Sequence, residues 1–86
     1  MFLEVPVLLW DEEKDDDVEV TMYINPMHVI SIEPINRANC YAVMTGEIYY
    51  QIPISRKKLK ILIEDFIKEN ILSKLYKDIK DQEGKN

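Results

Sequence analysis

The sequence predicts a small α+β domain, in which an antiparallel meander of four or five strands precedes a C-terminal amphipathic helix that breaks near Asn70. Three observations support this fold class. Several segments before residue 55 alternate apolar and polar residues, as half-buried strands do. Short Asn, Pro and Gly motifs separate them. After residue 55 the apolar residues recur at helical spacing instead.

The predicted strands cover residues 2–10, 18–24, 29–33, 40–44 and 48–54. The first strand contains Pro6, which lacks a ladder donor, so we expect an edge strand or a bulge there. Asn25 and Pro26 predict a short helical turn before the third strand. Gly46 marks a hairpin turn before the fifth strand, and Pro53 ends that strand's ladder.

Chain length predicts a single domain over residues 1–80, followed by a polar tail at 81–86. At 86 residues, apolar burial only narrowly exceeds chain entropy, so the domain gains from oligomerisation. The composition is that of an ordinary globular protein, with no run long enough to cross a bilayer and no signal peptide pattern. The lone Cys40 excludes an internal disulfide. We therefore expect a cytoplasmic protein without membrane contact.

An acidic loop joins the first two strands, and its acids are Asp11, Glu12, Glu13, Asp15, Asp16 and Asp17. Like charges at this density predict a solvated hairpin loop. The loop lacks the glycine and the ligand spacing of an EF-hand, so we expect only weak cation attraction and no metal site. It could also imitate a phosphate backbone, although mimicry usually spreads its carboxylates over a surface.

Charge is divided unevenly along the chain. Residues 1–50 carry a net charge of −8, whereas residues 51–86 carry +3. A nucleic-acid-binding sheet needs cations on the surface that it presents, so this distribution argues against nucleic acid as a partner. The cations concentrate in the helix instead.

The helix is predicted to begin after Ser55, whose hydroxyl suits an N-cap. The cations Arg56, Lys57, Lys58 and Lys60 lie at the positive end of the helix dipole, and such a violation can mark an interaction site. A first apolar face contains Leu59, Leu62, Ile63 and Phe66. A second stripe, Ile71, Leu72, Leu75, Tyr76 and Ile79, points in another direction. This second stripe needs a cover: the other side of the sheet, a second copy of the chain or a different protein.

The segment INPMHVISIEP, with the later TG turn, YYQIPIS and amphipathic helix, resembles the small bacterial flagellar and swarming-motility protein D family. The matching positions are Asn25, Pro26, His28, Val29, Ser31, Ile32, Glu33, Thr45, Gly46, Tyr50, Ile54 and Ser55. The resemblance covers about half the chain and implies a motility role; small bacteriophage proteins look similar. The same strand, hairpin and helix pattern also resembles a fragment of the LytTR DNA-binding domain, whose further strands and basic loops are missing here.

Conventional catalytic equipment is sparse in this sequence. His28 and Cys40 form the only possible nucleophile–base pair, and nothing in the sequence brings them together. Trp10, Tyr41, Tyr49 and Tyr50 suggest an aromatic platform, but strand alternation separates Tyr49 from Tyr50. We therefore expect no catalytic residues and no cofactor, but a self-associating protein-interaction module. The alternatives are a phage inhibitor or DNA mimic acting through the acidic face, and an oligomer that sequesters a small ligand.

Overall fold

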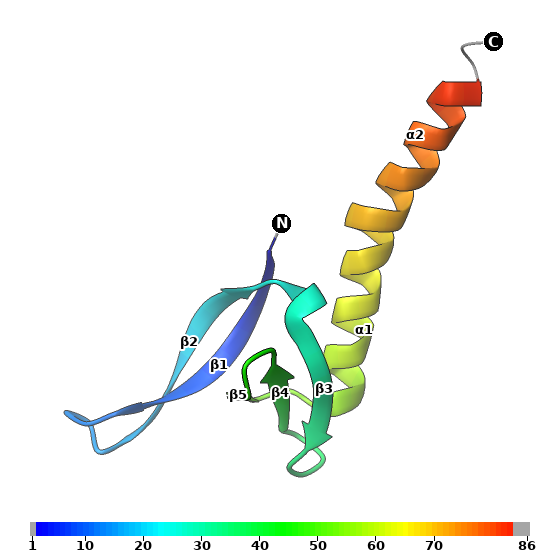
Figure 1. Ribbon diagram of the computed structural model, residues 1–86. Coiled ribbons are helices and arrows are strands. Elements are labelled where there is room, and N and C mark those ends of the chain that lie inside the picture. The colour runs from blue at the N-terminus through cyan, green and yellow to red at the C-terminus, as the bar shows by residue number, and fades with distance from the viewer. Residues whose placement is uncertain (1, 84–86) are drawn as a thin grey trace.

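A computed structural model describes residues 2–83 and confirms the α+β fold class (Figure 1). Five strands form one antiparallel sheet: β1 (Leu3–Asp11), β2 (Asp16–Ile24), β3 (Val29–Pro34), β4 (Cys40–Met44) and β5 (Ile48–Ile52). A short 3-10 helix, η1 (Pro26–His28), precedes β3. As predicted, Asn25 caps it: the side-chain oxygen of Asn25 accepts a hydrogen bond from the Met27 amide at 3.0 Å.

The strand order is β2-β1-β5-β4-β3, which differs from a single meander. A β1–β2 hairpin and a β3–β4–β5 meander are joined where Leu8 pairs with Gln51. Strand β1 is therefore an inner strand, and the expected edge position is wrong. In this register Pro6 faces Pro53, and because neither residue has an amide hydrogen the β1–β5 ladder stays short.

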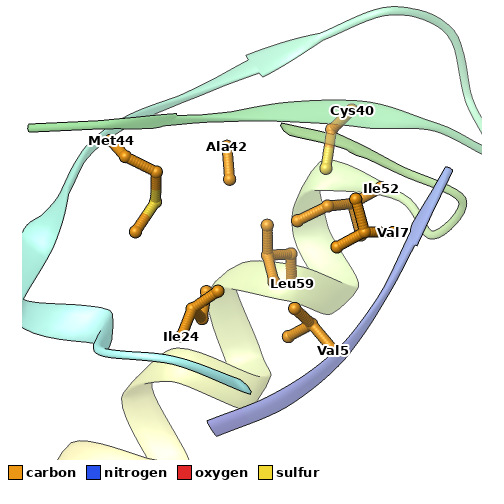
Figure 2. Packing of buried hydrophobic residues seen from close by; sticks show 8 residues of the cluster. All are labelled: Val5, Val7, Ile24, Cys40, Ala42, Met44, Ile52 and Leu59. Atoms are coloured by element: carbon orange, nitrogen blue, oxygen red, sulfur yellow. The ribbon is translucent and has the colours of Figure 1, made fainter. Parts of the chain in front are cut away.

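The core lies between one face of the sheet and the first part of the helix. Its buried residues come from four strands and from the helix: Val5, Val7, Ile24, Cys40, Ala42, Met44, Ile52 and Leu59. Figure 2 shows Leu59 reaching from the helix into the space between these strand side chains. Leu59 has no exposed surface, so it anchors the helix to the sheet.

The helical part of the chain comprises α1 (Arg56–Ile67), a π-helical turn η2 (Lys68–Leu72) and α2 (Ser73–Glu83). Around Asn70 the α-helix is thus interrupted by a π turn, and the chain stays helical throughout. Ile67 and Ser73, on either side of the π turn, both keep right-handed helical dihedrals. Asn70 does not cap a second helix, because its side-chain amide donates to the Phe66 carbonyl at 3.0 Å. The backbone amide of Ser73 donates to the carbonyl of Lys68, five residues earlier.

Helix α2 extends beyond the sheet, whereas α1 lies across it (Figure 1). The longest dimension of the molecule, 63 Å, reflects this projecting helix. Helix α2 continues to Glu83, so the first three residues of the predicted polar tail at 81–86 are helical; residues 84–86 lie outside the described residues.

Candidate protein-binding surfaces

The second stripe lies mostly in α2 and is uncovered. Leu72 and Leu75 are each 55% exposed, Tyr76 is 62% exposed and Ile79 is 48% exposed, whereas Ile71 is half-buried. The four exposed residues are spaced i, i+3, i+4 and i+7, so they share one helix face. The structure thus brings the predicted residues together on a surface that the chain's own sheet leaves open.

The π turn sets the direction of the second stripe. In an uninterrupted α-helix, at about 100° per residue, Leu72, Leu75 and Ile79 would lie nearly opposite Leu59. A π turn holds about one extra residue, which turns every later side chain back by roughly 100°. The stripe therefore lies at about a right angle to the face that packs on the sheet.

Polar groups border the second stripe. The Lys80 ammonium lies 5.3 Å from the Tyr76 ring centroid, a cation–π distance. A shallow hollow of about 270 Å³ lies beside the stripe, between Asn70, Lys74 and Asp78. These features give the stripe a partly polar rim, as protein interfaces have.

A second surface, the α1–β3 groove, was not foreseen from the sequence. Its volume is about 760 Å³, and its walls come from η1, β3 and α1. The apolar lining residues are Pro26, Met27, Val29, Ile30, Ile32, Ile63 and Ile67. Three cationic residues, Arg56, Lys57 and Lys60, line the same groove. The violation of the helix dipole in the first turn of α1 was the sequence signal for this site.

A β-bulge in β3 supplies the most exposed apolar residue of the groove. Val29 pairs with Met44, but the next pair joins Ser31 to Val43, so Ile30 is the extra residue. Ile30 is 66% exposed and lines the groove. Strand alternation alone could not locate this side chain, since a bulge depends on the partner strand.

The acidic loop is shorter than predicted. Strand β1 extends to Asp11 and β2 begins at Asp16, so the connection spans residues 12–15. One carboxylate oxygen of Asp11 accepts from the Glu13 amide at 3.0 Å, and Asp15 adopts a positive φ of 52°. Within residues 2–83, no group of three acidic, histidine or cysteine side chains is arranged to hold a metal ion. The loop is thus a hairpin tip whose backbone amides donate to the Asp11 carboxylate.

Cys40 and His28 lie toward opposite ends of strand β4. Cys40 pairs with Pro34 at one end, whereas the His28 carbonyl accepts from the Thr45 amide beyond the other end. Five residues of extended chain separate these ends by roughly 13 Å or more. Burial raises the pKa of the Cys40 thiol, which disfavours the reactive thiolate. The structure does not bring this nucleophile–base pair together.

The aromatic residues do not form one platform. Tyr41 and Tyr49 meet edge to face on the sheet surface away from α1, with ring centroids 6.1 Å apart. Tyr50 packs against the core on the other face, as strand alternation predicted. Trp10 lies near the hairpin tip and is 60% exposed.

Comparison of the chain with protein-family models, with curated proteins and with solved structures finds no match. The resemblance to the motility protein D family therefore stays a prediction. Among residues 2–83, no helix combines the length and the apolar character that crossing a bilayer requires.

Proposed function

We propose that this chain is a non-enzymatic protein-interaction module that self-associates through the second stripe. One observation carries the proposal: Leu72, Leu75 and Ile79 are about half exposed on a helix that projects beyond the domain. Contiguous apolar side chains on a projecting helix are typical of protein interfaces. The bacterial or bacteriophage origin and the cytoplasmic location remain predictions from the sequence.

A second copy of α2 is a suitable partner because the stripe complements itself. Residues spaced i, i+3, i+4 and i+7 form the seam by which two helices pack side by side. When two α2 helices pair, the polar residues beside the stripe bring like charges together. Residues 73–80 contain Lys74, Lys77 and Lys80 but only one acid, Asp78. Salt should therefore strengthen this association by screening the repulsion between lysines.

The test is a double substitution, Leu72→Glu with Leu75→Glu, in the full chain. Sedimentation at tens of micromolar should give a lower mass for this variant than for the wild type. The circular dichroism spectrum should not change, because both side chains are exposed. Lys77→Glu is the matched control: it changes net charge by the same amount on the opposite side of α2. A wild-type chain that is monomeric under these conditions contradicts the proposal.

The acidic loop supports a different function, inhibition of a cationic partner or mimicry of DNA. Its tip carries a dense group of exposed carboxylates. A variant with Asp15, Asp16 and Asp17 changed to Asn distinguishes this alternative, because it should lose such a partner and keep the self-association through α2. The third alternative, small-ligand sequestration, would use the α1–β3 groove, and binding of an apolar fluorescent probe lost on Ile63→Glu would favour it.

A further inference from the structure

Two surfaces outside the second stripe are opposite in charge and together suggest a further contact. The α1–β3 groove has an apolar lining and three cations, Arg56, Lys57 and Lys60. Of these, Lys60 has one acidic neighbour, Glu64, at 3.8 Å, in a pair whose side chains are both more than 60% exposed. A pair this exposed screens little of the groove's positive charge. An occupant of the groove should therefore be both apolar and acidic.

The tip of the β1–β2 hairpin has this chemistry. Trp10 is 60% exposed and Leu9 is 41% exposed, although both belong to a strand. In the hairpin register Trp10 lies opposite Asp17, and Asp11 lies opposite Asp16. The hairpin tip thus combines an exposed tryptophan with several carboxylates, and Trp is enriched among the residues that contribute most to binding at protein interfaces.

The hairpin tip cannot reach the groove of its own chain. Figure 1 shows the tip projecting to one side of the sheet, while η1, β3 and α1 lie on the other side. The groove borders β3, and the hairpin contains β2, so the two surfaces belong to opposite edges of the sheet. Contact between them requires two molecules.

We propose that the α1–β3 groove receives the β1–β2 hairpin tip of a second copy of this chain. Trp10 of that copy lies against Ile30, Ile63 and Ile67, and the hairpin carboxylates face the three cations. When each of two copies places its hairpin tip in the groove of the other, both grooves are filled and the two chains form a closed dimer. This interface goes beyond the contact proposed for α2 and does not depend on it.

Charge reversal in the full chain tests this pairing. The groove variant carries Arg56→Glu and Lys57→Glu, and the hairpin variant carries Asp15→Lys, Asp16→Lys and Asp17→Lys. Both are made in the Leu72→Glu, Leu75→Glu background, so that association through α2 does not contribute. Acidic residues in the first turn of α1 suit the helix dipole, so the groove variant should fold.

Each variant alone should associate at least about tenfold more weakly than the background, because like charges then meet. An equimolar mixture should recover the association, because both interfaces of the mixed pair are again complementary. Lys58→Glu with Lys68→Glu is the control, since it reverses two exposed cations that do not line the groove. Association that survives in either single variant, or a mixture that stays dissociated, overturns the proposal.

Trp10 provides a second measurement because it is the chain's only tryptophan. Its fluorescence should shift to shorter wavelength on association, as water leaves the indole, and return on dilution. Added salt should reverse this shift, opposite to its effect on pairing through α2. An emission maximum that does not change with protein concentration or with salt in the background variant counts against the proposal and in favour of a different occupant of the groove.

Discussion

Helices α1 and α2 are consecutive parts of one helical column, and both are amphipathic, yet only α1 is covered. Leu59 of α1 is completely buried, whereas Leu75 of α2 and Leu72, at the end of η2, are each 55% exposed. Their sequences do not explain this difference, because each contains apolar residues at helical spacing. The sheet is simply too short to cover both. Amphipathic spacing therefore indicates that a helix face needs a partner, without indicating which partner it has.

The π turn η2 lies between the covered helix α1 and the exposed helix α2. An unbroken α-helix would point the second stripe nearly away from the face that packs on the sheet, and the π turn brings it to about a right angle. Within this turn, the side-chain hydroxyl of Ser73 donates a hydrogen bond to the Lys68 carbonyl at 2.9 Å. π turns are rare and frequently lie at functional sites, which is a further reason for the binding role that we propose for α2.

The largest expected effect separates the two leucines that best represent the two helices. Leu59→Ala should lower the free energy of unfolding by about 2–5 kcal/mol, because it leaves a cavity in the core. Leu75→Ala should change it by less than about 0.5 kcal/mol at concentrations where the chain is monomeric, because Leu75 is 55% exposed. Urea denaturation followed by circular dichroism measures both. Equal losses would mean that α2 is covered within the monomer.

Deletion of Asn70 should separate folding from association. Removing one residue converts the π turn to α-helix and rotates the second stripe by roughly 100°. Folding should change by less than about 1 kcal/mol, since the deletion removes one side-chain hydrogen bond, to Phe66, and no core contact. Association through α2 should weaken about tenfold or more, because the rotated stripe no longer faces the partner helix in the same direction. Sedimentation of the variant beside the wild type is the measurement, and unchanged association would show that only apolar content counts.

The starts of the two helices should respond differently to loss of a serine hydroxyl. The Ser55 hydroxyl accepts from the Lys58 amide at 3.1 Å and caps α1, so Ser55→Ala should lower the free energy of unfolding by about 1 kcal/mol. Ser73 begins α2 within a continuous helix, where no cap is needed, so Ser73→Ala should cost less than about 0.5 kcal/mol. Thermal unfolding of the pair provides the comparison. A larger loss for Ser73→Ala would mean that the π turn stabilises the domain.

The smallest effect on stability is expected for a pair of residues on the exposed face of the sheet, Glu4 and Tyr23. Glu4 lies opposite Tyr23 and raises the pKa of Tyr23 above its usual value near 10, through hydrogen bonding to the phenol and through its negative charge. The raised pKa gives a small stability contribution that is present below pH 10 and is lost as the pH rises through the folded-state value. Glu4→Gln should lower the pKa of Tyr23 in an ultraviolet titration. The same titration should not change in the Leu72→Glu variant, because α2 lies away from this face.

Much of the fold could be predicted from local residue patterns. The alternation of Val18, Val20, Met22 and Ile24 predicted β2, and all four side chains are at least half-buried. Ser55 and Asn25 both cap helices as predicted, because a cap depends on a few neighbouring residues. The second stripe could also be read from spacing alone. These features share one property: the interactions that determine them lie within a few residues along the chain.

Features that depend on contacts between distant segments were predicted less well. The place of β1 inside the sheet depends on its pairing with β5, more than forty positions later. The bulge at Ile30 depends on the register with β4, and the groove depends on where α1 crosses β3. At Asn70, local reasoning recognised the change of phase but expected a break instead of a π turn.

By itself, the sequence determined the strand and helix types, the core faces of β2 and β5 and the position of a second apolar stripe along the helix. Residue periodicity carries that information, because side chains alternate along a strand and recur every 3.6 residues along a helix. Only the tertiary structure decided the strand order, the α1–β3 groove and the exposure of α2. These depend on how far the sheet reaches along the helix and on which edges remain unpaired, and both are set by packing between segments that are distant in the chain.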